Sequence, residues 1–412
     1  MARIYPFQPF RYTEQAGPLE NLVTQPYDKI SPAMQNRYLS LSPQNLVRVI
    51  LGERRAGDSG SDNVYTRAAR YLDDWIARGV LARDNHPGIF PYFQEFTIPD
   101  TGERLVRKGF IALGAVEDYS RGVVHRHEQT LSGPKKDRLE LLRHTHAHCG
   151  QLFMLYPDPA GAIDVLLDEA AALAPVAEVA DEYGAIHRVW RMTDAARGVV
   201  QQLMADKKLL IADGHHRYET ALAFRDENAG LPGADRVMMT FVNMHSPGVR
   251  ILATHRLVSG LDEGFADRFL RAAAAGFEVE EIGSLDGLKR AWDEGEDRTV
   301  IGAALGNRLF LLEDRQARGE LDVRVLHQRV LGQALGIGEE AVRDEKHLHY
   351  IRGLDAAVQE VRQGAAQIAF LLKPVSVEQV AATSFAGGVM PQKSTDFYPK
   401  LLSGLTIYRI AP

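Results

Sequence analysis

The sequence predicts a mixed fold of helices and strands, of the α/β or α+β class, and three observations lead to this prediction. Apolar residues recur every three or four positions over residues 64–79, which is the period of an amphipathic helix. Residues 89–113 contain two short runs of strand-forming side chains around a turn, which is typical of a hairpin. Residues 209–224 give a buried strand, a tight polar turn and a helix in direct succession.

The first hundred residues are expected to begin as extended chain and to continue into helices. Two prolines interrupt residues 5–12, so a long helix cannot form there. Ser31 is a good helix cap and Pro32 suits the first helical position, so a helix is predicted from about Pro32. The amphipathic helix over 64–79 should end at the glycine that closes this segment.

The next part of the chain is expected to hold a hairpin, a helix and a buried strand. Residues 89–96 and 106–113 form the predicted hairpin, with the Pro-Asp-Thr-Gly sequence at 99–102 as its turn. Residues 134–143 begin with proline and have the leucine spacing of a helix. The apolar residues 151–156 then indicate a buried strand.

The composition is that of an ordinary globular protein. The 412 residues include 48 Lys and Arg against 54 Asp and Glu, a net charge of −6, with 25% charged and 45% hydrophobic residues. These shares argue against a disordered chain. The acidic balance argues against a nucleic-acid partner, which would need clustered cations to neutralise phosphates. Length alone predicts two or three domains.

Cysteine content and hydropathy bear on where the protein works. Cys149 is the only cysteine, so no disulfide can form within the chain, and a reducing compartment is the simpler expectation. No apolar run approaches the length of a membrane-spanning helix, and the first residues lack the apolar stretch of a signal peptide. We therefore expect a cytoplasmic protein with no membrane partner. The sequence does not determine its oligomeric state.

The turn between the strand at 209–212 and the following helix has the densest chemical signal. It consists of Asp213, Gly214, His215, His216 and Arg217. A helix that begins here points free main-chain N–H groups into the turn, where an anion such as phosphate would be held. Gly214 permits close approach of the backbone, and Arg217 can bind two phosphate oxygens. We predict a phosphate site with Asp213 as a Mg²⁺ or ribose ligand. The alternative is that Asp213 only caps the helix.

A second cluster of chemically active residues precedes and opens the helix predicted at 134–143. If a phosphoryl group is transferred at such a phosphate site, cations have to neutralise its charge, and a further group has to orient or deprotonate the attacking hydroxyl. Glu128 is the first candidate for the base and for a further Mg²⁺ ligand, while His127 and His216 are candidates for proton transfer. Lys135 and Arg138 are predicted phosphate ligands. The alternative is a loop whose charges are solvated.

Near the C-terminus, Lys393, Ser394 and Thr395 place one cation and two hydroxyls in succession. Such a set could bind a phosphate or a substrate carboxylate. The alternative is that a hydroxyl of this segment caps a terminal helix.

Four further residues are possible contacts of the same pocket. His255 and Arg256 follow an apolar run at 249–253, so we expect them on a strand that neighbours the phosphate turn. A structural arginine in a salt bridge is the alternative for Arg256. Tyr27 and Asp28 are candidate substrate contacts.

His144, His146 and His148 alternate along the chain, which on a strand would put three imidazoles on one face. Their position at the end of a predicted helix favours a role beside the helix dipole over metal binding. The sequence does not settle whether they bind a metal.

A resemblance to a known family covers nearly the whole chain. The chain carries six ordered motifs, at residues 26–28, 127–130, 133–138, 213–218, 254–256 and 390–395. Together they resemble the bacterial and archaeal family called domain of unknown function 1015. The name of that family states no function.

The turn at 213–217 is also similar to the Gly-x-x-Arg phosphate-binding turn of the ParB and sulfiredoxin superfamily, with Gly214 and Arg217 at the two defining positions. This resemblance implies a ParB/sulfiredoxin-like nucleotide-binding core with flanking α/β lobes. We expect an N-terminal lobe at 1–115, the core at 116–260, and a lobe at 261–412 that returns its last motif to the central cleft.

Members of that superfamily include small-molecule kinases that phosphorylate free serine, nucleoside triphosphatases, and enzymes that use ATP to repair oxidised peroxiredoxins. The resemblance therefore implies a phosphotransferase or a nucleotide hydrolase. The first candidate is a small-molecule kinase that uses ATP or ADP with Mg²⁺, and free L-serine is the first acceptor. The alternative is a nucleotide-responsive binding or regulatory protein without chemistry.

Overall fold

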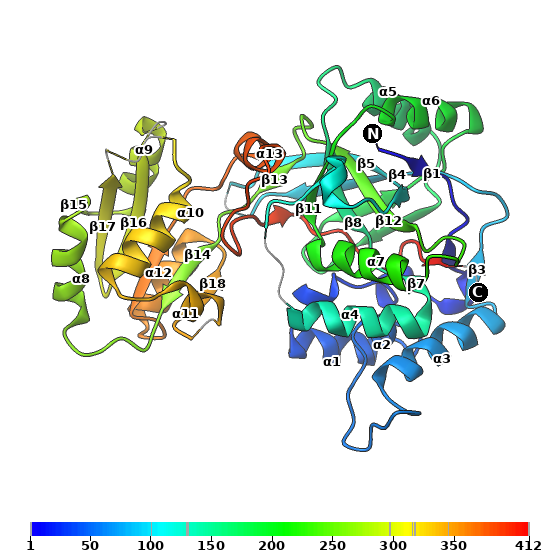
Figure 1. The fold of residues 1–412 in the computed structure, drawn as a ribbon, viewed down its shortest axis with the longest axis horizontal. Coiled ribbons are helices and arrows are strands. Elements are labelled where there is room, and N and C mark those ends of the chain that lie inside the picture. The colour runs from blue at the N-terminus through cyan, green and yellow to red at the C-terminus, as the bar shows by residue number, and fades with distance from the viewer. Residues whose placement is uncertain are drawn as a thin grey trace. The chain divides into compact units, whose positions relative to one another are not determined.

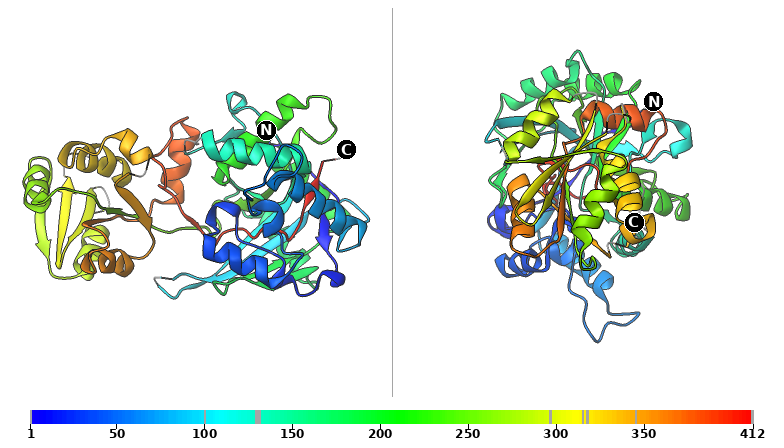
Figure 2. Two further views of the ribbon diagram at one scale, coloured as in Figure 1. Left: turned by 90° about the horizontal axis from the view of Figure 1, so that it is seen from below. Right: turned by 90° about the vertical axis from the view of Figure 1, so that its left-hand side faces the viewer.

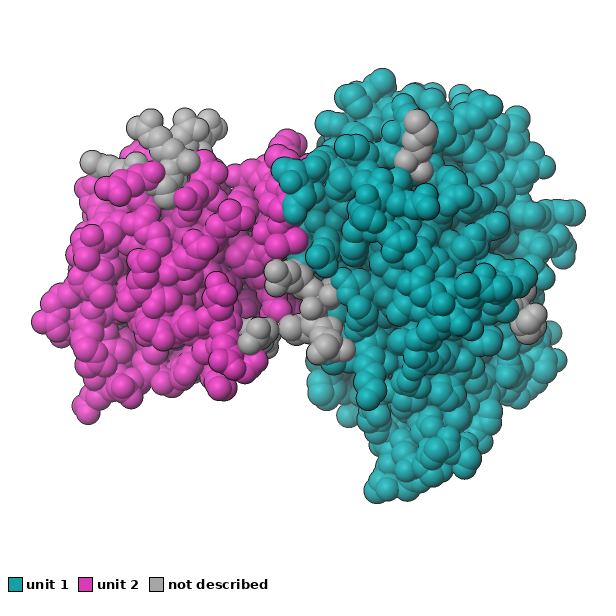
Figure 3. All heavy atoms as spheres, viewed as in Figure 1, with its two compact units in different colours: residues 1–249, 384–387, 399–412 teal, residues 250–383, 388–398 magenta. Residues whose placement is uncertain are grey.

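The structure is a computed structural model that describes residues 2–410 apart from residues 100, 129–131, 296–297, 315, 317–318 and 345. It divides into two compact units (Figure 3). Unit 1 comprises residues 1–249, 384–387 and 399–412, and unit 2 comprises residues 250–383 and 388–398. Both units contain sheets and helices, so the predicted mixed α/β class is confirmed.

Strands form the centre of unit 1 (Figure 1). They are β1 (Ile4–Tyr5), β2 (Phe10–Tyr12), β3 (Leu81–Arg83), β4 (Phe90–Thr97), β5 (Arg104–Ala115), β6 (Val124–His125), β7 (Ala147–His148), β8 (Leu152–Tyr156), β9 (Ala177–Ala180), β10 (Ile186–Val189), β11 (Leu209–Asp213), β12 (Arg236–Asn243) and β21 (Tyr408–Arg409). The main sheet has nine strands in the order β6-β11-β8-β12-β5-β4-β10-β9, with β1 paired to β5. Two small sheets join β2 to β3 and β7 to β21.

The helices of unit 1 pack on this sheet and on one another. They are α1 (Pro32–Leu41), α2 (Val47–Ile50), α3 (Val64–Ala77), α4 (Ser132–Thr145), α5 (Ala162–Ala171), α6 (Asp194–Met204) and α7 (His215–Glu227). One buried cluster joins the sheet to α5, α6 and α7, and a second surrounds α3 and includes Cys149 and Ile407.

A polar network lies on the sheet at β4, β5 and β10. His187, Gln94 and Arg107 are cross-strand neighbours there, because His187 pairs with Gln94 and Gln94 pairs with Arg107 in register. Gln94 donates to the carbonyl oxygen of Lys400 at 2.8 Å, and Arg107 donates to that of Pro399 at 2.5 Å. The network therefore fixes the C-terminal segment against the sheet.

Unit 2 is built on a six-stranded sheet. Its strands and helices are β13 (Arg250–Ile251), β14 (His255–Val258), α8 (Phe265–Ala274), β15 (Glu278–Ile282), α9 (Leu285–Glu294), β16 (Thr299–Leu305), β17 (Arg308–Asp314), α10 (Asp322–Val325), a π-helix (Leu326–Ala334), α11 (Glu339–Arg343), β18 (Leu348–Ile351), α12 (Leu354–Arg362), β19 (Ile368–Leu371) and β20 (Phe397–Tyr398), with α13 (Val377–Phe385) ending in unit 1. The strand order is β15-β17-β16-β19-β14-β18.

Helices cover both faces of this sheet (Figure 2). Leu371 of β19 belongs to a buried cluster with Leu288 of α9 and Val358 of α12. Phe370, the preceding residue, instead meets Phe269 of α8 with ring centroids 5.6 Å apart. Since successive strand residues point to opposite faces, α9 and α12 lie on one face and α8 lies on the other.

Most of the predicted elements are confirmed. The hairpin is β4 and β5, which pair antiparallel, and the strands predicted at 151–156 and 209–212 are β8 and β11. The helix predicted at 134–143 is α4, and the strongly amphipathic segment at 64–79 is α3. Ser31 caps α1 as predicted, because its hydroxyl accepts from the Met34 N–H at 3.2 Å.

The division into units differs from the predicted lobes. The predicted boundary at 115/116 falls within unit 1, where β5 pairs with β12 over seven residues from Gly109 to Ala115. The structure divides the chain at 249/250 and again near the C-terminus. Residues 399–412 belong to unit 1, so the chain leaves this unit and returns to it.

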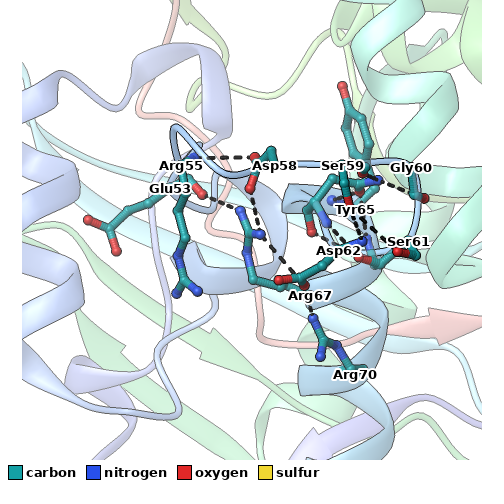
Figure 4. A network of polar contacts seen from close by, with 12 residues as sticks. Glu53, Arg55, Asp58, Ser59, Gly60, Ser61, Asp62, Tyr65, Arg67 and Arg70 are labelled. Atoms are coloured by element: carbon teal, nitrogen blue, oxygen red, sulfur yellow. Dashed lines mark hydrogen bonds and ion pairs between the residues drawn. The ribbon is translucent and has the colours of Figure 1, made fainter.

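The loop before α3 is held by ion pairs and hydrogen bonds (Figure 4). Arg67 is buried and donates to Asp58 at 2.7 Å and to the carbonyl oxygen of Glu53 at 2.9 Å. Asn63 caps the helix in a reciprocal arrangement with Thr66. The charged residues in these contacts therefore stabilise the local structure of the loop.

No helix within the described part of the chain has both the length and the apolar character that crossing a membrane requires.

Candidate functional site

The turn between β11 and α7 has a conformation that depends on glycine. Gly214 has φ +98° and is the cap residue of α7, which begins at His215. A Cβ at this position would lie 2.8 Å from Leu152 Cδ2 and 3.1 Å from the guanidinium carbon of Arg217. Gly214 thus lets Arg217 fold back over the turn. Having no side chain, it leaves the first N–H groups of α7 without a cap from the cap residue.

Asp213 does not cap the helix, because its carboxylate is bound by two cations. Arg217 Nη2 lies 2.6 Å from one oxygen and Lys400 Nζ lies 3.1 Å from the other. Burial alone would raise the pKa of Asp213, but Lys400, Arg217 and Lys29 outweigh burial and hold that pKa well below its ordinary value. The carboxylate is therefore ionised at neutral pH.

These contacts bear on the predicted Mg²⁺ site. Both oxygens of the Asp213 carboxylate already bind cationic groups, so this arrangement does not suit a metal ion held by Asp213. Among the described residues there is also no group of three or more His, Cys, Asp or Glu side chains placed to hold a metal ion.

Arg217 has a second internal partner. Its Nη1 donates to the carbonyl oxygen of Gln151, the residue before β8. The guanidinium therefore joins the turn to the neighbouring strand of the sheet, a structural contact that the sequence analysis did not predict.

Lys400 is the main site residue that sequence analysis missed. Its side chain is 8% exposed, and its own main chain is held by the amide of Gln94. Arg107, 1% exposed, bonds to both Gln94 and the carbonyl of Pro399. The polar network on the sheet thus positions the Lys400 ammonium at Asp213. A buried polar group that loses its hydrogen-bond partner costs free energy. The network therefore favours one fixed arrangement of its side chains.

The rings of His127 and His215 contact each other at the turn. His127 Nδ1 donates to the carbonyl oxygen of Ile211 at 2.8 Å, and the two imidazole rings meet edge to face with centroids 4.6 Å apart. Burial lowers the pKa of His127 to about 4 and also lowers that of His215. Both rings are therefore neutral at pH 7, and Nε2 of His127 is the nitrogen that can accept a proton.

Glu128 and His216, the other predicted acid and base residues, are both half-buried. Glu128 directly follows His127, and His216 lies in the first turn of α7. The described residues thus bring the histidines of both predicted clusters together in unit 1.

The two cations of α4 reach different partners. Lys135 Nζ forms an ion pair with Glu219 of α7 at 3.0 Å. Arg138 donates to the carbonyl oxygen of Ile50 at 2.6 Å, and its guanidinium lies 4.1 Å from the centre of the Tyr27 ring. Arg138 is therefore part of the surroundings of the turn, with its charge paired to Asp137, and Glu219 balances the charge of Lys135.

Tyr27 lies near the turn, and Asp28 is exposed. A cavity of about 70 Å³ is bordered by Tyr27, Arg138, Arg217 and Ser403 among others, a volume that suits water and not a nucleotide. Burial raises the pKa of Tyr27 to about 12, so its hydroxyl stays protonated at neutral pH.

The remaining predicted site residues belong to unit 2. His255 and Arg256 begin β14, which pairs with β18 and β19, so the expectation that they lie on a strand beside β11 is wrong. The apolar run at 249–253 did not reveal the strand that these residues join, because only Arg250 and Ile251 of that run form a strand, β13. Arg256 Nη2 donates to the carbonyl oxygen of Lys393 at 3.0 Å.

The segment 393–395 does not cap a helix. Ser394 donates to the carbonyl oxygen of Pro391 at 2.5 Å, and Lys393 has a left-handed backbone with φ 56°. The described residues after Thr395 form the strands β20 and β21 and contain no helix.

The three alternating histidines contact three different aromatic rings. His144 stacks on Tyr65, His146 meets Phe224 edge to face, and His148 of β7 stacks on Tyr408. Each ring thus has a packing role.

Comparisons with known proteins place the chain in a family. No curated protein matches it. The similar solved structures include a conserved hypothetical protein from Pyrococcus furiosus (17% identity, 69% of this chain and 92% of that chain, TM-score 0.37), a free serine kinase in complex with AMP (15%, 69% and 89%, 0.39), and SbnI with C-terminal truncation from Staphylococcus aureus (12%, 72% and 87%, 0.38).

The family match is far more extensive than any single motif. It runs over residues 4–334 and so includes the β11–α7 turn, the histidine pair at this turn and most of unit 2. The resemblance of the turn to ParB proteins stays a prediction. The protein belongs to the family described as Protein of unknown function (DUF1015).

Proposed function

We propose that unit 1 binds the phosphates of ATP or ADP at the β11–α7 turn and transfers a phosphoryl group to the hydroxyl of a small metabolite, with free L-serine as the first acceptor to test. One observation carries this proposal. The start of α7, the Gly214 turn and the cations Arg217 and Lys400 converge within unit 1.

The charge balance of this group supports an anionic ligand. Three cationic groups, Lys400, Arg217 and Lys29, act on the ionised carboxylate of Asp213, although the whole chain carries −6. The N-terminal end of a helix adds positive potential at the same place. Positive charge and main-chain N–H donors would therefore both bind a phosphate at this turn. Any Mg²⁺ would then arrive with the nucleotide.

The neighbouring groups support proton transfer. His127 is neutral at pH 7 and keeps its Nδ1 hydrogen on the Ile211 carbonyl, and the carboxylate candidate for the base, Glu128, is the next residue. In phosphoryl transfer such a base takes the proton of the attacking hydroxyl as the bond to phosphorus forms and the nucleotide leaves.

Binding and turnover are tested separately. Calorimetry of the full-length chain with Mg·ATP and Mg·ADP should give binding that Arg217→Ala abolishes, while Arg121→Ala, at an exposed arginine outside the turn, retains it. Product analysis with a panel of hydroxylated metabolites, L-serine first, then tests transfer. Absence of both binding and turnover would refute the proposal.

A second candidate is a nucleotide-responsive binding protein without chemistry. It is favoured by the observation that Arg217 pairs with Asp213 and also donates to the carbonyl oxygen of Gln151, which is the arrangement of a stable turn. Glu128→Gln separates the two candidates. In a kinase it should abolish turnover and spare binding, whereas in a sensor it should change little. Glu140→Gln, at a glutamate of α4 paired with Arg143, is the matched control.

A further inference from the structure

Unit 2 contains a cavity of about 440 Å³, and every described residue that borders it belongs to that unit. The starts of β14 and β16 border the cavity, and so does Leu372, which directly follows β19. Because β19 runs antiparallel to both β14 and β16, these three strand ends meet at one edge of the sheet. The volume is that of a pocket for a small metabolite.

Two cationic side chains border the cavity, one on a strand and one just after a strand. Arg256 of β14 is 1% exposed, and its guanidinium is held by the carbonyl oxygens of Thr254 and Lys393. Lys373 follows β19, and its ammonium donates to the carbonyl oxygen of Trp292 at 3.0 Å. Carbonyl groups thus hold both cations at the border of the cavity.

A carboxylate borders the same cavity. Asp322 begins α10 and receives a hydrogen bond from the Thr299 side chain. The Lys373 ammonium donates to the Trp292 carbonyl, and its positive charge also acts on the Asp322 carboxylate. The border of the cavity therefore carries both cationic groups and a carboxylate.

We propose that this cavity binds a small metabolite that carries an anionic group together with an amino or hydroxyl group. Arg256 and Lys373 bind the anionic group, and Asp322 binds the ammonium or hydroxyl. Arg256 and Ser394, which the sequence analysis assigned to a nucleotide, border this cavity. No residue of the turn at 213–217 does, so the proposal is independent of the function proposed for unit 1.

The test uses the full-length chain and calorimetry. Each proteinogenic L-amino acid and glycerol phosphate are titrated separately, so that a carboxylate and a phosphate are distinguished as the anionic group. At least one of these probes should bind. Lys373→Met and Asp322→Asn should each weaken that binding at least tenfold.

Lys289→Met is the matched control, because Lys289 is an exposed lysine of α9 that does not border the cavity. It should leave the affinity unchanged. The proposal is overturned if no probe binds, or if a probe binds and neither Lys373→Met nor Asp322→Asn weakens it. Loss of nucleotide binding in the Arg217→Ala variant would bear on the function proposed for unit 1 and not on the cavity of unit 2.

Discussion

The ammonium of Lys400 lies 3.1 Å from the carboxylate of Asp213, although 187 residues separate the two in the sequence. Arg217 binds the other carboxylate oxygen at 2.6 Å. The turn that the sequence singles out is therefore completed by a cation from the C-terminal segment. This relationship makes the last residues of unit 1 part of its candidate site.

Replacing Lys400 by methionine tests how much the turn depends on this cation. The substitution leaves a buried carboxylate with one fewer partner, so we expect a loss of about 3 kcal/mol in the free energy of unfolding. Denaturant unfolding measures it. Lys108→Met removes an ammonium 2.7 Å from the half-exposed Asp168 and should cost less than about 1 kcal/mol. Equal losses in the two variants would contradict a special role for Lys400.

The local part of the site could be predicted from sequence, and the distant part could not. The order of strand, glycine turn and helix at 209–224 is encoded in adjacent residues, so the pattern revealed it. Lys400 lies beyond the motif at 390–395, in a segment with no local signal for burial. Its role arises only when Gln94 and Arg107, on two other strands, bind the chain at residues 399–400.

Gly214→Ala tests the second requirement of the turn. An alanine there would have to adopt φ +98° and would press its Cβ to 2.8 Å from Leu152, so both strain and a clash are expected. We predict a loss of about 2 to 4 kcal/mol, since backbone strain alone costs about 1 to 3 kcal/mol. Gly122→Ala is the control, because Gly122 has φ +62° and open space around its Cβ position. Gly122→Ala should show only the cost of backbone strain. If both variants lose the same free energy of unfolding, the structure relieves the clash with Leu152.

Buried neutral histidines predict a stability that falls in mild acid. Burial lowers the pKa of His148 to about 4, so between that value and the ordinary histidine pKa the unfolded chain binds more protons than the folded one. Stability contributed by His148 is therefore present at neutral pH and lost as the pH falls from about 6.5 to 4, by up to about 3 kcal/mol. His148→Phe retains a ring against Tyr408 and should flatten this pH dependence in denaturant unfolding.

His86→Phe provides the comparison, because His86 is exposed. It should leave the pH dependence as in the original protein. If His148→Phe also leaves it unchanged, the ring of His148 titrates normally in the folded state.

The elements of the fold could be predicted better than its division into units. The hairpin at β4 and β5 and the helix α3 follow from periodicity within one segment. The division at 249/250 has no such signal, because β12 ends at Asn243 and the chain passes to β13 through a short polar loop. The return of residues 399–412 to unit 1 depends on pairings such as Thr24 with Ser403, which no local pattern reveals.

Asp322 predicts the opposite pH response in unit 2. Burial raises its pKa to about 6, against the lowering effects of Thr299 and Lys373, so between about pH 4 and 6 the folded protein keeps a proton that the unfolded chain has lost. Stability therefore falls as the pH rises through this range, by at most about 3 kcal/mol. Asp322→Asn removes the charge and keeps the shape, so it should stabilise the protein above pH 6 and abolish this part of the pH dependence in scanning calorimetry. Asp286→Asn, at an exposed carboxylate of α9, should change neither property. A less stable Asp322→Asn protein at pH 7.5 would mean that the ionised carboxylate makes contacts strong enough to offset its burial.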